Sequence, residues 1–131
     1  KGDSVLDAVP VAAPALMRAE KLTKAAAKIG FDWPDVERVL EKLDEERAEL
    51  SEAVAGKNED EILDEMGDLL FVCANIARKL KVSPEEALRR ANEKFVRRFR
   101  FVEEGAKTAG RPYSLEELEG FWQDAKRAEK A

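Results

Sequence analysis

The chain has 131 residues, with 28 acidic and 23 basic side chains, a formal net charge of −5, no histidine and a single cysteine. This length fits one domain. The modest negative charge argues against a general nucleic-acid binder or a membrane-surface protein. No apolar run approaches the length of a membrane span, and no signal-peptide pattern is present. We therefore expect a cytoplasmic protein with neither nucleic acid nor a membrane as its partner.

The N-terminal segment differs in character from the rest of the chain. Residues 1–13 combine small side chains and a proline without clear periodicity, so we expect an extended arm followed by one folded domain at 14–131. The chain begins at Lys1 rather than at a methionine. This start indicates a processed product or a fragment.

The remainder of the chain predicts an all-α fold, because no strand pattern appears in it. Helices are expected at about 14–29, 34–55, 59–81, 84–104 and from 114 to the C-terminus. Gly105 is expected to end the fourth of these helices. Phe31 and Trp33 predict a hydrophobic plug between the first two, with a ligand contact as the alternative. Long amphipathic helices with few aromatic residues often complete their core by pairing, so we expect helical hairpins whose core is completed by dimerisation.

The stretch 43–71 is predicted to be a helical hairpin with a short turn at 55–58. Gly56 suits the left-handed position that ends the first helix. Asn58 and Glu61, three residues apart, are typical of a capping box at the start of the second helix. In such a hairpin, residues equally far from the turn face each other.

Two pairs of acidic residues lie at matched distances from this turn. Glu49 and Glu46 lie seven and ten residues before its glycine, and Glu65 and Asp68 lie seven and ten residues after its asparagine. At a rise of about 1.5 Å per residue, both pairs should sit roughly 10–15 Å from the turn. Each pair has i, i+3 spacing and so shares one helix face. Four carboxylates are therefore expected to converge.

These carboxylates border apolar stripes, which makes a purely solvated position costly. Glu46 falls on the flank of one stripe, Glu65 falls inside the other, and Asp68 lies at its edge. An unpaired carboxylate there would cost several kcal/mol or take up a proton. A divalent cation supplies the missing charge, and an all-carboxylate ligand set suits Mg²⁺, with Mn²⁺ as a substitute, better than zinc or copper. The alternative is an ordinary solvated acidic surface.

Two small residues of the same helix carry further expectations. Gly67 lies in mid-helix, where glycine costs about 1 kcal/mol relative to alanine. Close approach by another backbone or by a ligand would explain it. Cys73 sits on the apolar face and is expected to be a small core residue in a reducing compartment.

The fourth and fifth predicted helices carry candidate substrate-binding residues. Lys94 and Arg98 are spaced i, i+4 and point the same way, as a pair gripping phosphate oxygens would. The alternative is a solvated basic face partly paired with glutamates. Trp122 and Lys126 have the same spacing and could stack on a base and hold a phosphate, although a packed tryptophan beside a lysine is as common.

The acidic residues also resemble a known family motif. Residues 45–49 and 65–68 have the form EExxE…ExxD, the pattern of the all-α nucleoside triphosphate pyrophosphohydrolases, and the surrounding sequence is similar to MazG. The resemblance covers nearly the whole chain, through GFDW at 30–33, DEMGDLLF at 64–71, ANEKFVRRFR at 91–100 and Phe121-Trp122. It is greatest to the C-terminal catalytic half of two-domain MazG proteins. The CPWD…QTH segment that opens the N-terminal half is missing.

The resemblance implies a homodimer whose helices complete a four-helix-bundle-like core around each active site. It also implies hydrolysis of (d)NTPs to the monophosphate and pyrophosphate with Mg²⁺. By position it assigns the metal ligands to Glu46, Glu49, Glu65 and Asp68, phosphate contacts to Lys42, Lys94 and Arg98, and nucleotide contacts to Trp122 and Lys126. Glu45 or Glu49 would take the proton of the attacking water. The turn is shorter than in MazG relatives, and Glu61 stands where a basic residue can occur, which puts a phosphate contact from that turn in question.

Two alternative functions remain open from the sequence. The first is a pyrophosphatase with the same metal site and a narrow specificity, for one dNTP or a modified nucleotide. The second is a non-catalytic helical regulatory module, in which the acidic faces are surface and the basic helix docks a partner. This second alternative predicts no dependence on Mg²⁺.

Overall fold

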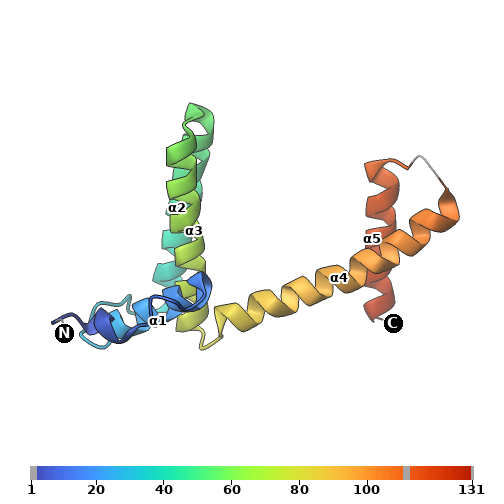
Figure 1. Cartoon of the computed structure of the whole chain (residues 1–131). Coiled ribbons are helices and arrows are strands. Elements are labelled where there is room, and N and C mark those ends of the chain that lie inside the picture. Colours follow the sequence, from blue (N-terminus) through green and yellow to red (C-terminus); the bar gives the residue numbers. More distant parts are fainter. Residues whose placement is uncertain (1–2, 111–112, 131) are drawn as a thin grey trace. The chain divides into compact units, whose positions relative to one another are not determined.

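The computed structural model describes residues 3–110 and 113–130, and within these ranges it contains helices and no strand, as the sequence predicted. The elements are the 3-10 helix η1 (Val5–Ala8), α1 (Ala15–Ala27), α2 (Val36–Gly56), α3 (Glu59–Lys79), α4 (Pro84–Ala109) and α5 (Leu115–Lys130) (Figure 1). In the described part of the chain, no helix is both long and apolar enough to cross a membrane. The chain divides into two compact units, Lys1–Ala87 and Leu88–Ala131.

The first unit is built on the α2–α3 hairpin, whose two helices pack side by side (Figure 1). Asp35 caps the start of α2 by accepting a hydrogen bond from the Arg38 N–H at 3.1 Å. Lys57, with φ of 58°, takes the left-handed position that the sequence analysis assigned to Gly56, because α2 continues through the glycine. The Asn58 side chain then accepts from the Glu61 N–H at 3.0 Å, which is one of the two hydrogen bonds of the predicted capping box.

α3 is the central helix of this unit, because both α1 and α2 contact it. The buried apolar residues of these three helices are Ala19, Ala25, Val39, Ala53, Val72 and Ala74. The expectation that Cys73 belongs to the core is wrong, since its side chain is exposed. The neighbouring helices cover α3 at Val72, Ala74 and Asn75 instead. In the N-terminal segment predicted to be extended, Ser4 caps the short helix η1.

The second unit is the α4–α5 hairpin. The prediction that Gly105 ends the fourth helix is wrong, since α4 continues to Ala109. The physical reason for the glycine is a close approach: a Cβ at Gly105 would lie 2.6 Å from Cδ1 of Phe121 on α5. α5 begins with a capping box, in which Ser114 Oγ accepts from the Glu117 N–H and the Glu117 carboxylate accepts from the Ser114 N–H.

A candidate metal centre on the helical hairpin

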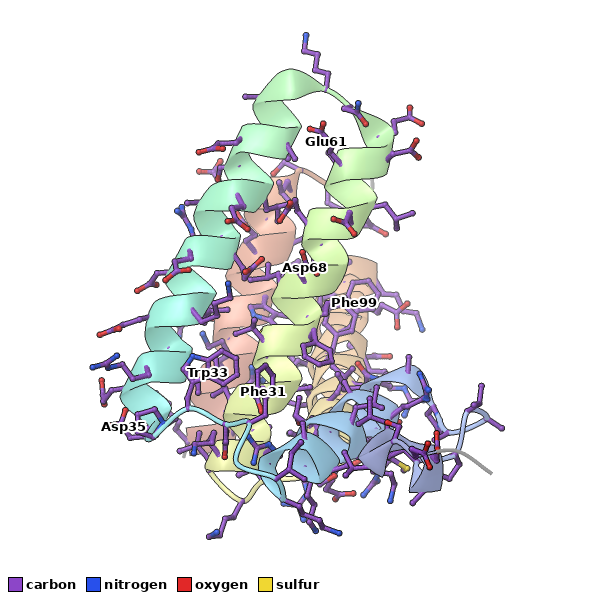
Figure 2. The ribbon with its side chains drawn as sticks, turned by 90° about the vertical axis from the view of Figure 1, so that its left-hand side faces the viewer. Phe31, Trp33, Asp35, Glu61, Asp68 and Phe99 are labelled. Carbon is purple, nitrogen blue, oxygen red and sulfur yellow. The ribbon has the colours of Figure 1, made fainter. Side chains whose placement is uncertain are left out.

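The α2–α3 hairpin brings together the carboxylates that the sequence placed at one level. One oxygen from each of Glu46, Glu49 and Glu65 lies within 4.8 Å of the others. A second set, Asp64, Glu65 and Asp68, meets the same criterion and shares Glu65 with the first. Figure 2 shows Asp68 part-way along α3, with Glu61 nearer the turn. The predicted convergence across the hairpin is therefore found for Glu46, Glu49 and Glu65, whereas Asp68 groups with Asp64 and Glu65 on α3.

The cluster holds more negative charge than its surroundings satisfy. Glu46 is only 4% exposed, and its Oε1 atom is buried without a hydrogen-bond partner among the described residues. The Oε1 atom of Glu65 is likewise buried and unpartnered in the described part of the chain. Such groups cost free energy unless a partner is supplied. Two orphaned carboxylate oxygens at the centre of an acidic cluster fit a divalent cation, which takes oxygen ligands of this kind.

The acid–base properties of the cluster follow from the same crowding. Burial raises the pKa of Glu65 above its ordinary value, and the neighbouring carboxylates of Glu49 and Asp68 raise it further. Burial also raises the pKa of Asp68, with Asp64 and Glu46 adding to the effect and Lys42 opposing it. The cluster thus resists carrying its full negative charge in the absence of a cation.

Lys42 supplies a positive charge at the edge of this cluster. Its Nζ atom lies 3.0 Å from Oε2 of Glu46, one turn along α2, and 3.6 Å from Oε1 of Glu45. The hydrogen bond to Glu46 is the main reason why the pKa of Lys42 is raised. This leaves Lys42 positively charged at neutral pH and beside the carboxylates, with 35% of its side chain exposed.

The two glutamates considered as proton acceptors lie in different surroundings. Glu49 belongs to the carboxylate set with Glu46 and Glu65. Glu45 lies outside both carboxylate sets, and its side chain is 63% exposed and paired with Lys42. The structure therefore groups Glu49, and not Glu45, with the metal-ligand candidates.

The remaining predicted substrate-binding residues belong to the second unit. Arg98 donates from Nε to Glu129 at 3.0 Å and lies over the Trp122 ring, 5.7 Å from its centroid. Trp122 also packs against Phe95 with ring centroids 5.4 Å apart. The exposed Lys94 has no ion pair among the described residues, and Lys126 is half-buried on α5. Arg98 thus contacts both the Trp122 ring and the Glu129 carboxylate.

Asp64 was missed by the sequence analysis, although its spacing could have revealed it. Asp64 lies four residues before Asp68, so the two share a helix face in the same way as i, i+3 pairs do. The motif directed attention to the paired spacing of Glu65 and Asp68. A search for every acidic residue on that face of α3 would have included Asp64.

These observations define the class of the protein. It is an all-α domain whose central hairpin presents carboxylates from two antiparallel helices, in an arrangement suited to a divalent cation. Residues 35–102, just over half of the chain, match the MazG nucleotide pyrophosphohydrolase domain. The chain therefore belongs to the MazG family.

Individual relatives agree with this family. Over 133 residues the chain is 45% identical to the nucleoside triphosphate pyrophosphohydrolase of Escherichia coli K12, covering 96% of this chain and 50% of that protein. It is 44% identical over 116 residues to the nucleoside triphosphate pyrophosphohydrolase/pyrophosphatase MazG of Thermotoga maritima, covering 86% and 44%. It is 47% identical over 131 residues to the uncharacterized protein YabN of Bacillus subtilis, covering 97% and 27%. The chain thus spans half or less of these relatives.

Proposed function

We propose that the protein hydrolyses nucleoside triphosphates, both NTPs and dNTPs, to the nucleoside monophosphate and pyrophosphate with a divalent cation. The observation that carries this proposal is the cluster on α2 and α3, with two buried oxygens that lack a partner in the described chain. A triphosphate binds to proteins as a metal complex, so a carboxylate cluster with a cation deficit suits it. The names of the E. coli and T. maritima relatives support the same reaction.

Glu46, Glu49, Glu65 and Asp68 would hold the cation, and Asp64 lies close enough to join them. We propose Mg²⁺ as the physiological ion and Mn²⁺ as a substitute, because the donors are all carboxylates. When bound, such an ion supplies positive charge to the phosphates and lowers the pKa of a water.

Proton transfer is assigned to Glu49 in preference to Glu45. Glu49 is exposed and lies within the cluster, where a water beside the triphosphate can reach it. The Glu45 carboxylate is already paired with Lys42. A general base must lie within hydrogen-bond reach of the proton that it takes, and membership of the cluster favours Glu49 on that ground.

Lys42 would contact a phosphate oxygen, because it is a half-exposed cation at the edge of the cluster. The assignment of the remaining substrate-binding residues rests on the family resemblance; these residues are Lys94, Arg98, Trp122 and Lys126. Arg98 would exchange the Glu129 carboxylate for a phosphate, since a guanidinium binds both acceptors through the same fork of donors. Trp122 and Lys126 would lie against the nucleotide.

We further propose that the chain acts as a homodimer in the cytoplasm. α3 leaves large apolar side chains uncovered in the single chain, among them Leu63 at 74% and Leu70 at 50% exposure. Exposed apolar side chains that gather on one helix mark an interaction surface. Pairing of two copies would bury them and complete the helical bundle.

The test is a product assay with each NTP and dNTP, in Mg²⁺ and in EDTA, with nucleotides and pyrophosphate separated chromatographically. We expect Mg²⁺-dependent monophosphate and pyrophosphate from most substrates. Activity on one nucleotide alone would replace the broad specificity by a narrow one. Absence of any product would contradict the proposed reaction, and a melting temperature indifferent to nucleotide and Mg²⁺ would point to the regulatory module.

A further inference from the structure

Lys42 lies on α2 within reach of two glutamates of different character. Its Nζ atom is 3.0 Å from Oε2 of Glu46 and 3.6 Å from Oε1 of Glu45. Glu46 is buried and belongs to the carboxylate set with Glu49 and Glu65. Glu45 is exposed and lies outside both carboxylate sets. A single ammonium group can therefore pair either with a candidate metal ligand or with a carboxylate that has no part in the metal site.

The charge of Lys42 acts on carboxylates of both helices. The hydrogen bond to Glu46 raises the pKa of Lys42 most, and the charges of Glu45 and Glu49 raise it further. Across the hairpin, burial raises the pKa of Asp68, and the charge of Lys42 opposes that rise. Lys42 thus offsets part of the negative charge that the cluster accumulates on α2 and α3.

Lys42 and a bound divalent cation would use the same carboxylate. Lys42 pairs with Oε2 of Glu46, and Oε1 of Glu46 is buried without a partner among the described residues. A cation held by this carboxylate would lie beside the ammonium group, and like charges at such short range repel each other. The ion pair between Lys42 and Glu46 is therefore weakened as soon as a cation is bound.

Side-chain motion alone would let Lys42 leave Glu46. A lysine that precedes its glutamate by four residues is in the less favourable order for a helical ion pair, so little helix stability depends on this contact. The lysine stem is flexible and its ammonium group is a point charge without a fixed geometry. Its side chain is 35% exposed, and Oε1 of Glu45 is already within 3.6 Å. An alternative partner is thus available one residue away.

We propose that Lys42 is an internal counter-ion of the α2–α3 carboxylate cluster. It pairs with Glu46 when no divalent cation is bound, and it moves to Glu45 when one binds. Only the consequence rests on the proposed function: once it has left Glu46, Lys42 is available to a phosphate oxygen of the triphosphate. By thermodynamic linkage, the cation and the triphosphate then favour each other's binding.

The experiment measures Mn²⁺ binding by electron paramagnetic resonance in the absence of nucleotide. Lys42→Met removes the counter-ion at a similar side-chain length, and Lys42→Arg keeps a positive charge at the same position. Lys21→Met is the matched control, because it makes the same change in net charge on α1, which contributes no carboxylate to either set. Thermal melts in EDTA check that each variant folds, and Lys42→Gln replaces Lys42→Met if that variant does not.

Lys42→Met should bind Mn²⁺ at least about threefold more tightly than the unmodified protein, because no ammonium group has to leave Glu46. Lys42→Arg and Lys21→Met should stay close to the unmodified affinity. A lysine that merely contacts phosphate predicts no change in Lys42→Met, and one that orients Glu46 as a metal ligand predicts weaker binding. Unchanged or weaker Mn²⁺ binding by Lys42→Met would therefore overturn the counter-ion.

Glu45→Gln tests the second partner of Lys42. In the otherwise unmodified protein it should weaken Mn²⁺ binding at least about twofold, whereas in Lys42→Met it should have little effect, because no ammonium group then needs the Glu45 carboxylate. Equal weakening in both backgrounds would overturn the move to Glu45. Because no nucleotide is used, tighter binding by Lys42→Met in a protein that releases no pyrophosphate from NTPs would support the counter-ion and reject the proposed reaction alone.

Discussion

The two helical hairpins of this protein use charge in opposite ways. In α4–α5, Glu129 accepts hydrogen bonds from both Arg97 and Arg98, at 3.1 and 3.0 Å, so a carboxylate from α5 is paired with cations from α4. In α2–α3, carboxylates gather around Glu65, and buried oxygens of Glu46 and Glu65 lack a partner in the described chain. We call α4–α5 the balanced hairpin, because its carboxylate is paired with cations that hold the helices together. We call α2–α3 the unbalanced hairpin, because its unpaired carboxylate oxygens favour the binding of a cation. The contrast therefore separates packing from binding.

The largest expected effect comes from the unbalanced hairpin. Glu65→Gln and Glu46→Gln keep the side-chain shape and remove one negative charge, and each should reduce pyrophosphate release by at least about 100-fold, because a metal ligand is lost. Circular dichroism should show an unchanged helical content. Glu129→Gln is the control from the balanced hairpin and should preserve Mg²⁺ dependence. Near-normal turnover in both cluster variants would show that these carboxylates do not hold a catalytic ion.

A steric change tests the balanced hairpin. Gly105→Ala places a methyl group 2.6 Å from the Phe121 ring and should destabilise the protein by about 1–3 kcal/mol, through overpacking. Gly120→Ala is the matched control on α5, because outside its own stretch of helix a Cβ there meets none of the described atoms within 4 Å. It should stabilise by about 0.5–1 kcal/mol through helix propensity. Equal effects of the two substitutions in chemical denaturation would disprove the packing of Phe121 on Gly105.

The contributions of Glu65 and Glu129 to stability should change with pH in opposite directions, which distinguishes the two hairpins. The folded-state pKa of Glu65 is raised, so the folded chain holds that proton more tightly than the unfolded chain, and stability falls as pH rises from about 4.5 through the folded value. Glu65→Gln removes this loss, and its melting temperature relative to the unmodified protein should rise between pH 4 and 7 in EDTA. A constant difference would show that Glu65 is not strained by its neighbours.

Glu129 should behave in the opposite sense. Its pKa is lowered by the hydrogen bonds from Arg98 and Arg97, so its stabilising contribution is present above about pH 4.5 and is lost as pH falls through the lower folded value. Glu129→Gln should therefore lower the melting temperature at pH 7 more than at pH 3. An equal decrease in melting temperature at both pH values would indicate that Glu129 stabilises the hairpin through packing rather than through its charge.

The smallest expected effect is at Gly67, on the metal-bearing helix. Outside its own stretch of helix, a Cβ there meets no atom of the described residues within 4 Å, so the close approach by another segment that the sequence suggested is not found in that part of the chain. Gly67→Ala should therefore stabilise by about 0.5–1 kcal/mol in chemical denaturation. Loss of activity in a stabilised Gly67→Ala protein would indicate approach by a ligand or a second copy.

The sequence predicted the hairpin and its acidic cluster because both depend on local rules. Helix period and distance from the turn sufficed to bring Glu46, Glu49 and Glu65 together. The same rules misplaced Gly105 and Cys73, whose surroundings depend on which helix packs where. A glycine signals equally a helix end or a close contact, and only the position of Phe121 decides between them.

The ion pairs that join the segment before α2 to α3 could not be found from the sequence for the same reason. Asp32 and Arg78 are 46 positions apart and meet only because the segment before α2 folds against α3. Asn75 carries no motif, and only the fold shows that it is 2% exposed and accepts a hydrogen bond from Arg78. Local spacing reveals functional groups on one element, whereas contacts between elements require the tertiary structure.

Direct cation binding to the protein without nucleotide tests the central claim most simply. Mn²⁺ is titrated into the protein, and free Mn²⁺ is followed by electron paramagnetic resonance, for the unmodified chain, Glu65→Gln and Glu129→Gln. The account predicts saturable binding that Glu65→Gln weakens at least about tenfold and that Glu129→Gln leaves unchanged. Equal binding by Glu65→Gln, or no binding by the unmodified protein, would contradict the assignment of the α2–α3 carboxylates as a metal centre.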